Sequence, residues 1–215
     1  MAVLFDMDGV VVDSERYWPE LEAERIFPEV VPDQGVQPEE VMGMYYREIY
    51  DYLDEHYAVA VDRDRFVEVF DATARELYGE RAALMDGFHD LVEDLQAQGT
   101  PVGLVTSSPH PWIDVVLDRF DLDGAFDAIV SAEDVPRGKP EPDVYERAVA
   151  ELGVAPERCV AVEDSPTGAA AAKAARLRCL GYTGVHDGLD PADVDSIAAT
   201  PTELRTLLFE TLAAE

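Results

Sequence analysis

Apolar residues follow two different patterns along this chain. After a short apolar run at residues 2–5, residues 14–82 carry apolar side chains at helical spacing and show no convincing strand. From residue 86 onward, short apolar runs alternate with amphipathic segments. Such alternation predicts parallel strands joined by right-handed helical crossovers. We therefore expect an α/β fold in which a doubly wound parallel sheet is interrupted, after its first strand, by an α-helical insert.

The same pattern places the individual elements and the domain boundaries. We expect a core domain of residues 1–13 and 83–215 and an inserted helical domain of residues 14–82. The predicted strands are residues 2–5, 101–105, 128–130, 159–162 and 177–181. The predicted helices are residues 15–27, 38–56 and 63–81 in the insert, and 88–98, 111–120, 142–152, 167–176 and 202–213 in the core.

Polar side chains follow several of the predicted strands, where each strand ends or in the loop beyond it. In an open α/β sheet the carboxyl ends of the strands form the edge where ligands bind. We therefore expect these side chains to converge, although carboxylates at a strand end are also common as solvated caps. The residues are Asp6 and Asp8, Thr106 with Ser107 and Ser108, Lys139, and Glu163 with Asp164.

The chemistry of this set points to a cation and a phosphoryl group. Four carboxylates that meet at one edge require a hard divalent cation, and a set of oxygen ligands suits Mg²⁺. A hydroxyl at the start of a helix and a fixed ammonium suit a phosphoryl group in transfer. Lys139 is one of only two lysines in the chain, so its place in this loop favours a functional position.

Four sequence motifs resemble those of the haloacid dehalogenase-like hydrolase superfamily. They are D-M-D-G-V-V-V-D-S-E, V-T-S-S, G-K-P-E-P-D and V-E-D-S-P-T-G, in the order and with the spacing of that family. The helical insert between the first two motifs resembles the cap of the phosphoglycolate phosphatase and β-phosphoglucomutase branch. The resemblance implies a Rossmann-like core, a cap domain, bound Mg²⁺, and hydrolysis of a small phosphorylated metabolite that resembles phosphoglycolate or a sugar phosphate.

The resemblance also implies a role for each motif residue. Asp6 would attack phosphorus and form an aspartyl-phosphate, and Asp8 would act as the general acid and base. Thr106 and Lys139 would hold the phosphoryl oxygens. Mg²⁺ would be bound by the Asp6 carboxylate, the backbone carbonyl of Asp8 and Asp164, with Glu163 acting directly or through water. Ser107 is counted with the residues that contact the substrate.

Two further features are implied for the insert. Asp13 and Ser14, and residues 82–86 on the return, correspond to the linkers of the cap, where hinges would allow closure. The stretch from Gly43 to Arg47 resembles the family's substrate-specificity stretch, with one extra residue before the arginine. Arg47 and Gly43 are therefore expected to contact the substrate, although Arg47 could equally be a solvated charge on a helix.

Two alternative functions remain open. A β-phosphoglucomutase-like enzyme would return the phosphoryl group to a sugar, but Trp18 and Pro109 stand where those mutases carry a histidine and a lysine. A receiver-like signalling domain also combines a phospho-accepting aspartate with Mg²⁺, a threonine and a lysine. Receiver domains are about half as long as this chain and have no helical insert.

The composition of the chain argues against some classes of binding partner. The formal net charge of -30 argues against binding to nucleic-acid phosphates. No apolar run approaches the ~20 residues that span a bilayer, and no export signal is recognised before Asp6. We expect a cytoplasmic monomer without a membrane partner, in which Cys159 and Cys179 are buried free thiols.

The acidic excess suggests a protein adapted to molar salt, where the Debye length falls to ~3 Å. Asp and Glu total 46 against 16 Lys and Arg, and they are spread along the chain. Because self-repulsion destabilises such a compact state at low ionic strength, we predict that the midpoint of thermal unfolding rises with KCl concentration. A midpoint that does not respond to KCl would identify an ordinary acidic protein instead.

Overall fold

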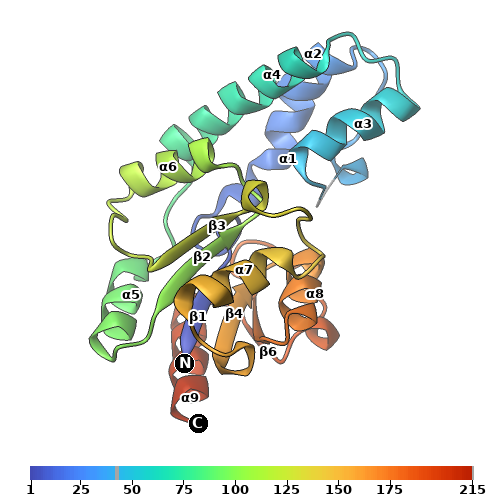
Figure 1. Ribbon diagram of the computed structural model, residues 1–215. Helices are drawn as coiled ribbons and strands as arrows, with labels where there is room; N and C mark the ends of the chain where they lie inside the picture. The colour runs from blue at the N-terminus through green and yellow to red at the C-terminus, as the bar shows by residue number, and fades with distance from the viewer. Residues whose placement is uncertain (42–43, 215) are drawn as a thin grey trace. The chain divides into compact units, whose positions relative to one another are not determined.

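A parallel sheet forms the centre of one of two compact units in the computed structural model, which describes residues 1–41 and 44–214 (Figure 1). This unit comprises Met1–Asp13 and Ala83–Glu215. Within the described residues the sheet has six strands in the order β3-β2-β1-β4-β5-β6, and each neighbouring pair is parallel. The strands are β1 (Ala2–Phe5), β2 (Val102–Thr106), β3 (Ala128–Ser131), β4 (Cys159–Glu163), β5 (Arg178–Tyr182) and β6 (Ser196–Ala198). The α/β fold with a doubly wound parallel sheet is confirmed.

The sequence predicts five of these strands and misses β6. The prediction of a polar loop at residues 196–198 is wrong, because these residues pair with β5 from Leu180↔Ser196 to Tyr182↔Ala198. Ser196 is exposed and Ile197 only half-buried, so β6 carries no apolar run that would mark it as a strand. A three-residue edge strand of this kind is defined by its neighbour rather than by its own residues.

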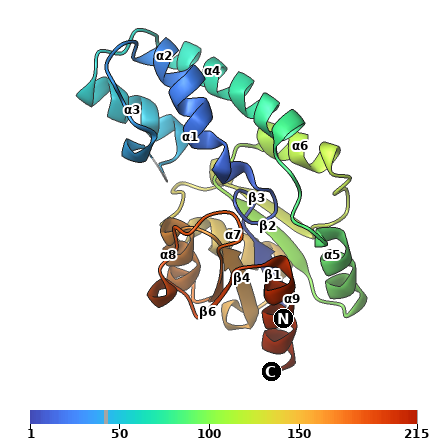
Figure 2. The same ribbon diagram turned by 180° about the vertical axis from the view of Figure 1, so that it is seen from behind.

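Helices cover both faces of the sheet. On one face, α7 and α8 pack on apolar side chains of the strands around the buried Leu4 and Ala161. The opposite face carries Phe5, whose ring lies edge-on to that of Phe88 in α5, with the ring centroids 5.4 Å apart. In Figure 2, α5 and α9 stand nearer the viewer. The helices of this unit are α5 (Phe88–Ala97), α6 (His110–Arg119), α7 (Asp143–Leu152), α8 (Pro166–Ala174) and α9 (Pro201–Ala213).

The second compact unit, Ser14–Ala82, is helical throughout its regular elements. Its α-helices are α1 (Trp18–Leu21), α2 (Phe27–Val30), α3 (Tyr46–His56) and α4 (Arg63–Glu76), and π-helical turns span Glu22–Ile26 and Leu77–Arg81. Aromatic rings fill its interior: Phe66 and Phe70 are buried, with ring centroids 4.7 Å apart, and Trp18 packs on Phe70. The two units have the residue ranges expected from the sequence.

Two expectations for this helical unit are wrong. Residues 38–56 do not form one helix: Pro38–Glu40 is a single 3₁₀ turn, and α3 begins only at Tyr46. The first helical run also continues past the expected end at residue 27, since the π-helical turn Glu22–Ile26 leads directly into α2, which contains Pro28. Pro38 begins the 3₁₀ turn, and Pro28 lies within the helical run instead of ending it.

The two connections between the units run beside each other. The N–H of Asp13 donates to the carbonyl oxygen of Ala83 at 3.1 Å, and the N–H of Ala83 donates to the Asp13 carboxylate at 2.6 Å. A further backbone bond joins Met85 to Val11 at 2.9 Å. The chain thus leaves the sheet unit and returns to it through paired segments, the positions at which hinges are expected.

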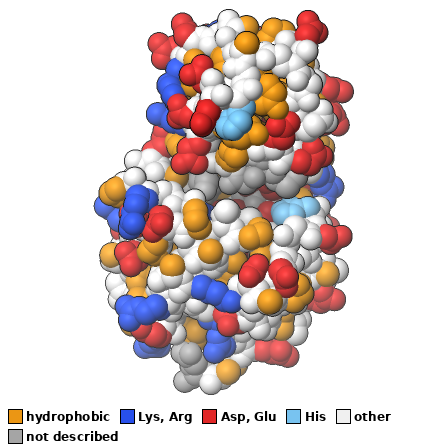
Figure 3. All heavy atoms as spheres, turned by 90° about the vertical axis from the view of Figure 1, so that its right-hand side faces the viewer, with side chains coloured by type: hydrophobic (Ala, Val, Ile, Leu, Met, Phe, Trp, Pro, Cys, Tyr) orange, Lys and Arg blue, Asp and Glu red, His pale blue; other side chains and the backbone are white. Residues whose placement is uncertain are grey.

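The surface reflects the acidic composition. On the face shown in Figure 3, acidic side chains are spread over the visible surface rather than gathered into one patch. Both cysteines are buried free thiols, as expected. Among the described residues, no helix is both long and apolar enough to cross a membrane.

One acidic side chain of the helical unit is buried. Glu22 lies in the π-helical turn after α1 and is 8% exposed. Burial, with a smaller contribution from Glu15, raises the pKa of Glu22 from 4.5 to about 8. Between these two values the folded protein holds a proton that the unfolded chain releases, so the free energy of unfolding falls as pH rises through this window.

Substitution of Glu22 by Gln removes this penalty. We predict that Glu22→Gln raises the free energy of unfolding on the order of 2 kcal/mol at pH 8 and much less at pH 5, because one pKa unit corresponds to about 1.4 kcal/mol. Denaturant unfolding at both pH values measures the difference. The exposed Glu24→Gln serves as the matched control and is expected to change little. An equal effect of Glu22→Gln at pH 5 and pH 8 would contradict a raised pKa.

Candidate active site

Asp6 follows the central strand β1 and lies between the ends of β2 and β4. The register pairs Phe5 with Leu104 on one side and with Val162 on the other, and the N–H of Asp6 donates to the carbonyl oxygen of Val162 at 3.0 Å. The next residue of β4 is Glu163, so its side chain and that of Asp6 reach the same edge of the sheet. Convergence of these strand ends is thus a consequence of register.

Lys139 joins two of the converging carboxylates. Its Nζ donates to Asp6 Oδ1 at 2.6 Å, to Glu163 Oε1 at 2.6 Å and to the carbonyl oxygen of Val105 at 3.1 Å. The Lys139 side chain is only 5% exposed. All three donor positions of the ammonium are therefore used inside the protein, which fixes the charge in one place.

Glu163 has one oxygen that is fully used and one that is not. Tyr145, from α7, donates its hydroxyl to the same Oε1 atom that accepts from Lys139. The Oε2 atom is buried and has no hydrogen-bond partner among the described residues. Because an unsatisfied buried carboxylate oxygen is costly, this atom is a candidate ligand for a cation.

Gly168 makes the room that Glu163 needs. It lies in the first turn of α8, where a Cβ atom would stand 1.9 Å from Glu163 Oε2 and 2.2 Å from its Cδ. No residue with a side chain fits there unless the carboxylate moves. Glycine at the end of the V-E-D-S-P-T-G motif is therefore required by the space that the Glu163 carboxylate occupies.

Asp8 is held by a chain of hydroxyl groups. Ser108 Oγ donates to Asp8 Oδ2 at 2.7 Å, while the N–H of Ser108 donates to Thr106 Oγ1 at 2.9 Å. Ser131, at the end of β3, donates from its Oγ to the carbonyl oxygen of Ser108 at 2.8 Å. The backbone turns sharply after Asp8 because Gly9 has a φ of 76°. Three neighbouring strands thus fix the orientation of Asp8.

The acidic residues fit a hard divalent cation. Asp6, Glu163 and Asp164 are all buried, and each offers an oxygen within 4.8 Å of the others. An all-oxygen set of this kind suits Mg²⁺. With Lys139 as the positive partner, three ionised carboxylates leave two negative charges to be balanced, which is the charge of one such cation.

Burial shifts the pKa values of the ionisable groups in this cluster. The pKa of Asp6 is raised well above its usual range, first by burial and then by the carboxylates of Glu163, Asp164 and Asp8, although Lys139 opposes the shift. Burial, followed by Glu163, also raises the pKa of Asp164. Burial acts to lower the pKa of Lys139, but Asp6 and Glu163 outweigh it and hold the ammonium charged.

The remaining expected site residues lie as follows. Ser107 is half-buried beside Thr106 in the loop after β2, and its contact with a substrate stays a prediction. Arg47 is exposed on α3, and its Nε donates to the hydroxyl of Tyr46 at 2.8 Å. Gly43 lies outside the described residues.

Two side chains contact the cluster without having been expected there from the sequence: Tyr145 binds Glu163, and His186 binds Asp164 at 2.7 Å. Ser108 was expected at this edge without a stated role, and it binds Asp8. Tyr145 and His186 lie on a helix face and in a polar loop, where nothing in the sequence pointed to the site.

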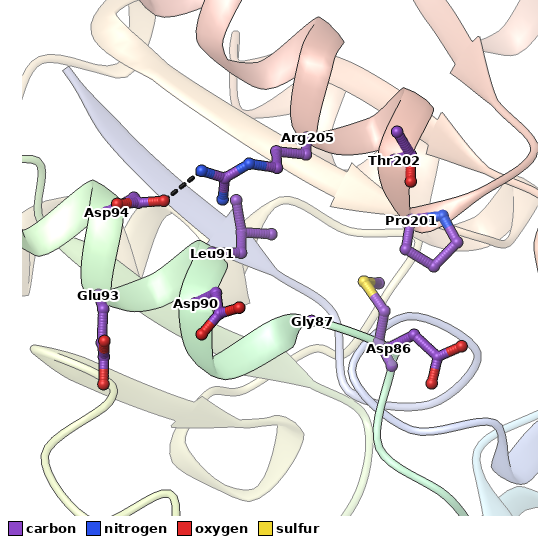
Figure 4. Close-up of a pocket in the computed structure, with 10 residues that line it drawn as sticks. Asp86, Gly87, Asp90, Leu91, Glu93, Asp94, Pro201, Thr202 and Arg205 are labelled. Carbon is purple, nitrogen blue, oxygen red and sulfur yellow. Dashed lines mark hydrogen bonds and ion pairs between the residues drawn. The ribbon is translucent and has the colours of Figure 1, made fainter.

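A separate pocket of about 400 Å³ lies between α5 and α9 (Figure 4). Its lining includes Asp86, Asp90 and Asp94, and Asp94 forms an ion pair with Arg205 across it. None of the cluster residues described above is part of its lining. This pocket and the buried acidic cluster are therefore different features of the same unit.

Comparison with known proteins places this arrangement in a family. The model of the haloacid dehalogenase-like hydrolases matches residues 1–176. Hexitol phosphatase B of Escherichia coli (strain K12) is 35% identical over 222 residues, which cover 97% of this chain and 96% of that protein. Validoxylamine A 7'-phosphate phosphatase of Streptomyces hygroscopicus subsp. limoneus is 32% identical over 204 residues and 94% of each chain.

Solved structures agree with the sequence comparison. The crystal structure of CbbY from Rhodobacter sphaeroides in complex with phosphate superposes with a TM-score of 0.79 at 27% identity, over 94% of this chain and 95% of that one. A family match over most of the chain thus agrees with three features described above: the sheet order, the spacing of the four motifs and the buried cluster at the strand ends. The chain belongs to the haloacid dehalogenase-like hydrolase family.

Proposed function

We propose that this hydrolase is a Mg²⁺-dependent phosphatase that acts on a small phosphorylated metabolite through an aspartyl-phosphate. The observation that carries the proposal is the buried cluster of Asp6, Glu163 and Asp164 around Lys139. It combines a nucleophilic carboxylate, ligands for a cation and a fixed ammonium within one edge of the sheet. These are the groups that transfer of a phosphoryl group requires.

Asp6 is the proposed nucleophile. Its carboxylate attacks phosphorus in line with the leaving oxygen, a new P–O bond forms to Asp6, and the bond to the alcohol breaks. Lys139 is bound to Asp6 Oδ1 and reduces the repulsion between this carboxylate and an incoming phosphate. Thr106, buried at the end of β2, supplies a further hydroxyl for the phosphoryl oxygens.

Asp8 is the proposed general acid and base. It protonates the leaving alcohol oxygen in the first step and takes a proton from the attacking water in the second. The Ser108 hydroxyl donates to Asp8 Oδ2 at 2.7 Å. This hydrogen bond orients the Asp8 carboxyl group for the proposed role.

The cation would be held by the Asp6 and Asp164 carboxylates, the Asp8 carbonyl and Glu163, directly or through water. When bound, Mg²⁺ supplies positive charge that stabilises the phosphoryl oxygens as negative charge develops on them. It also offsets the charge of the buried carboxylates and so favours the ionised form of Asp6, which is the nucleophilic form. The unpartnered Oε2 of Glu163 supports this proposal.

The proposed substrate is the phosphate ester of a sugar or sugar alcohol. A curated relative named as a hexitol phosphatase covers nearly the whole chain, which supports this class; phosphoglycolate is the other candidate. Residues 14–82 are proposed to act as a cap that carries substrate contacts, with Arg47 and Gly43 among them. The paired backbone segments at Asp13 and Ala83 support hinges at its boundary.

Hydrolysis is favoured over the mutase reaction. Trp18, at the position where the family's mutases carry a histidine, packs against the rings of Phe70 and Tyr78 within the helical unit. Pro109, where they carry a lysine, precedes α6 in extended backbone. Neither side chain carries a charge that could bind a second phosphate: proline has no donor, and tryptophan offers only a neutral indole N–H. Water is therefore the proposed acceptor.

Steady-state kinetics test the proposal. We predict Mg²⁺-dependent turnover of p-nitrophenyl phosphate in molar KCl, with the highest kcat/KM in a panel of phosphate esters for a hexitol or sugar phosphate. Asp6→Asn lacks the nucleophilic carboxylate and is expected to lower kcat/KM by about 1000-fold or more, which corresponds to ~4 kcal/mol.

Asp118→Asn is the matched control, since Asp118 is exposed on α6 and should leave kcat/KM unchanged. Retained turnover by Asp6→Asn would remove Asp6 from its role. A stable phosphoprotein without turnover would indicate a signalling domain. Preference for phosphoglycolate would keep the mechanism and change the substrate class.

A further inference from the structure

His186 reaches the metal-binding edge from a loop that none of the four motifs includes. The loop follows β5, and the imidazole Nε2 lies 2.7 Å from Asp164 Oδ2. The Asp164 side chain is 4% exposed and that of His186 is 33% exposed. The ring therefore stands between a buried carboxylate and the surface.

The hydrogen bonds of the ring define which nitrogen carries the proton. The N–H of Gly188 donates to His186 Nδ1 at 3.0 Å, so Nδ1 acts as an acceptor. In a neutral imidazole the proton then resides on Nε2, and this N–H donates to Asp164. The loop thus presents a donor to Asp164 without requiring a charged histidine.

Gly188 also gives the ring the space it occupies. A Cβ atom at Gly188 would stand 2.8 Å from Nδ1 and 2.9 Å from Cε1 of His186. Such contacts are closer than packed side chains tolerate, so any residue other than glycine would displace the ring. The N–H of Gly188 therefore holds the imidazole, and the missing side chain of Gly188 leaves room for the ring.

We infer that His186 is a positioning residue that orients Asp164 for the cation; this inference rests on the proposed Mg²⁺ site. Its donor occupies Oδ2 and leaves Oδ1 available to a metal ion. Hydrogen-bonded partners of metal ligands fix the ligand geometry, and their loss typically weakens metal binding 10–100-fold. In this chain the partner of Asp164 is His186, which lies outside the four motifs. The loop after β5 therefore tunes the affinity of the site for Mg²⁺.

Isothermal titration with Mg²⁺ alone tests this role. We expect His186→Ala to raise the Kd for Mg²⁺ about 10-fold or more. His186→Gln should retain much of the affinity, because its amide N–H can reach a similar position. Gly188→Ala should also weaken binding, since it displaces the ring. His110→Ala is the matched control: His110 pairs with Asp134 at 2.9 Å on the surface, and its loss should leave the Kd within about 2-fold.

Kinetics separate positioning from a general structural role. At saturating Mg²⁺ the kcat of His186→Ala should stay within a few-fold of the unaltered protein, while the Mg²⁺ concentration for half-maximal activity rises in parallel with the Kd. A lower kcat or melting temperature with an unchanged Kd would overturn the inference, as would tighter Mg²⁺ binding by His186→Ala.

Absence of Mg²⁺ binding by the unaltered protein would overturn this inference and the proposed metal site together. Mg²⁺ binding that depends on His186, without turnover of any phosphate ester, would overturn only the proposed function.

Discussion

Three buried carboxylates that share a single ammonium determine the chemistry at the carboxyl edge of the sheet. Asp6, Glu163 and Asp164 are withdrawn from water, and Lys139 forms hydrogen bonds with the first two. An ionised cluster of this composition keeps two uncompensated negative charges in a low-dielectric environment, where electrostatic energies are large. Protonation is one way to relieve it, and the raised pKa of Asp6 reflects this. A divalent cation is the other, and in the proposed mechanism it leaves the nucleophile ionised.

The fold maintains this costly arrangement through rigid elements. Asp6 follows the central strand of the sheet, so it has neighbours from β2 and β4 on both sides. Close packing then holds Glu163, whose carboxylate lies against Gly168 and accepts a hydrogen bond from Tyr145. Interactions that stabilise the folded state are thereby used to keep charges close together, a common feature of catalytic sites.

Much of the sheet and of the site follows from the sequence, for physical reasons that also explain the failures. The strands around Asp6 are fully buried, so their apolar runs, rich in Val, Leu and Ala, can be recognised in the sequence. Motif residues such as Lys139 and Asp164 are recognised together with them. The edge strand β6 carries no such run and depends on pairing with β5. The hydrogen-bond partners of the motif residues cannot be recognised in the sequence either. His186 and Tyr145 reach the cluster through tertiary contacts, and local periodicity does not show which distant segments will meet. The resemblance implies the roles of these residues, whereas their geometry required the structure.

A crystal structure with Mg²⁺ and beryllium fluoride, a mimic of a bound phosphoryl group, would locate both the nucleophile and the cation. We expect beryllium bonded to an Asp6 carboxylate oxygen, with a cation about 2.1 Å from oxygens of Asp6 and Asp164 and Lys139 in contact with the fluorides. A beryllium adduct on another carboxylate, or a cation bound away from Asp164 while Asp6 remains paired only with Lys139, would contradict this expectation.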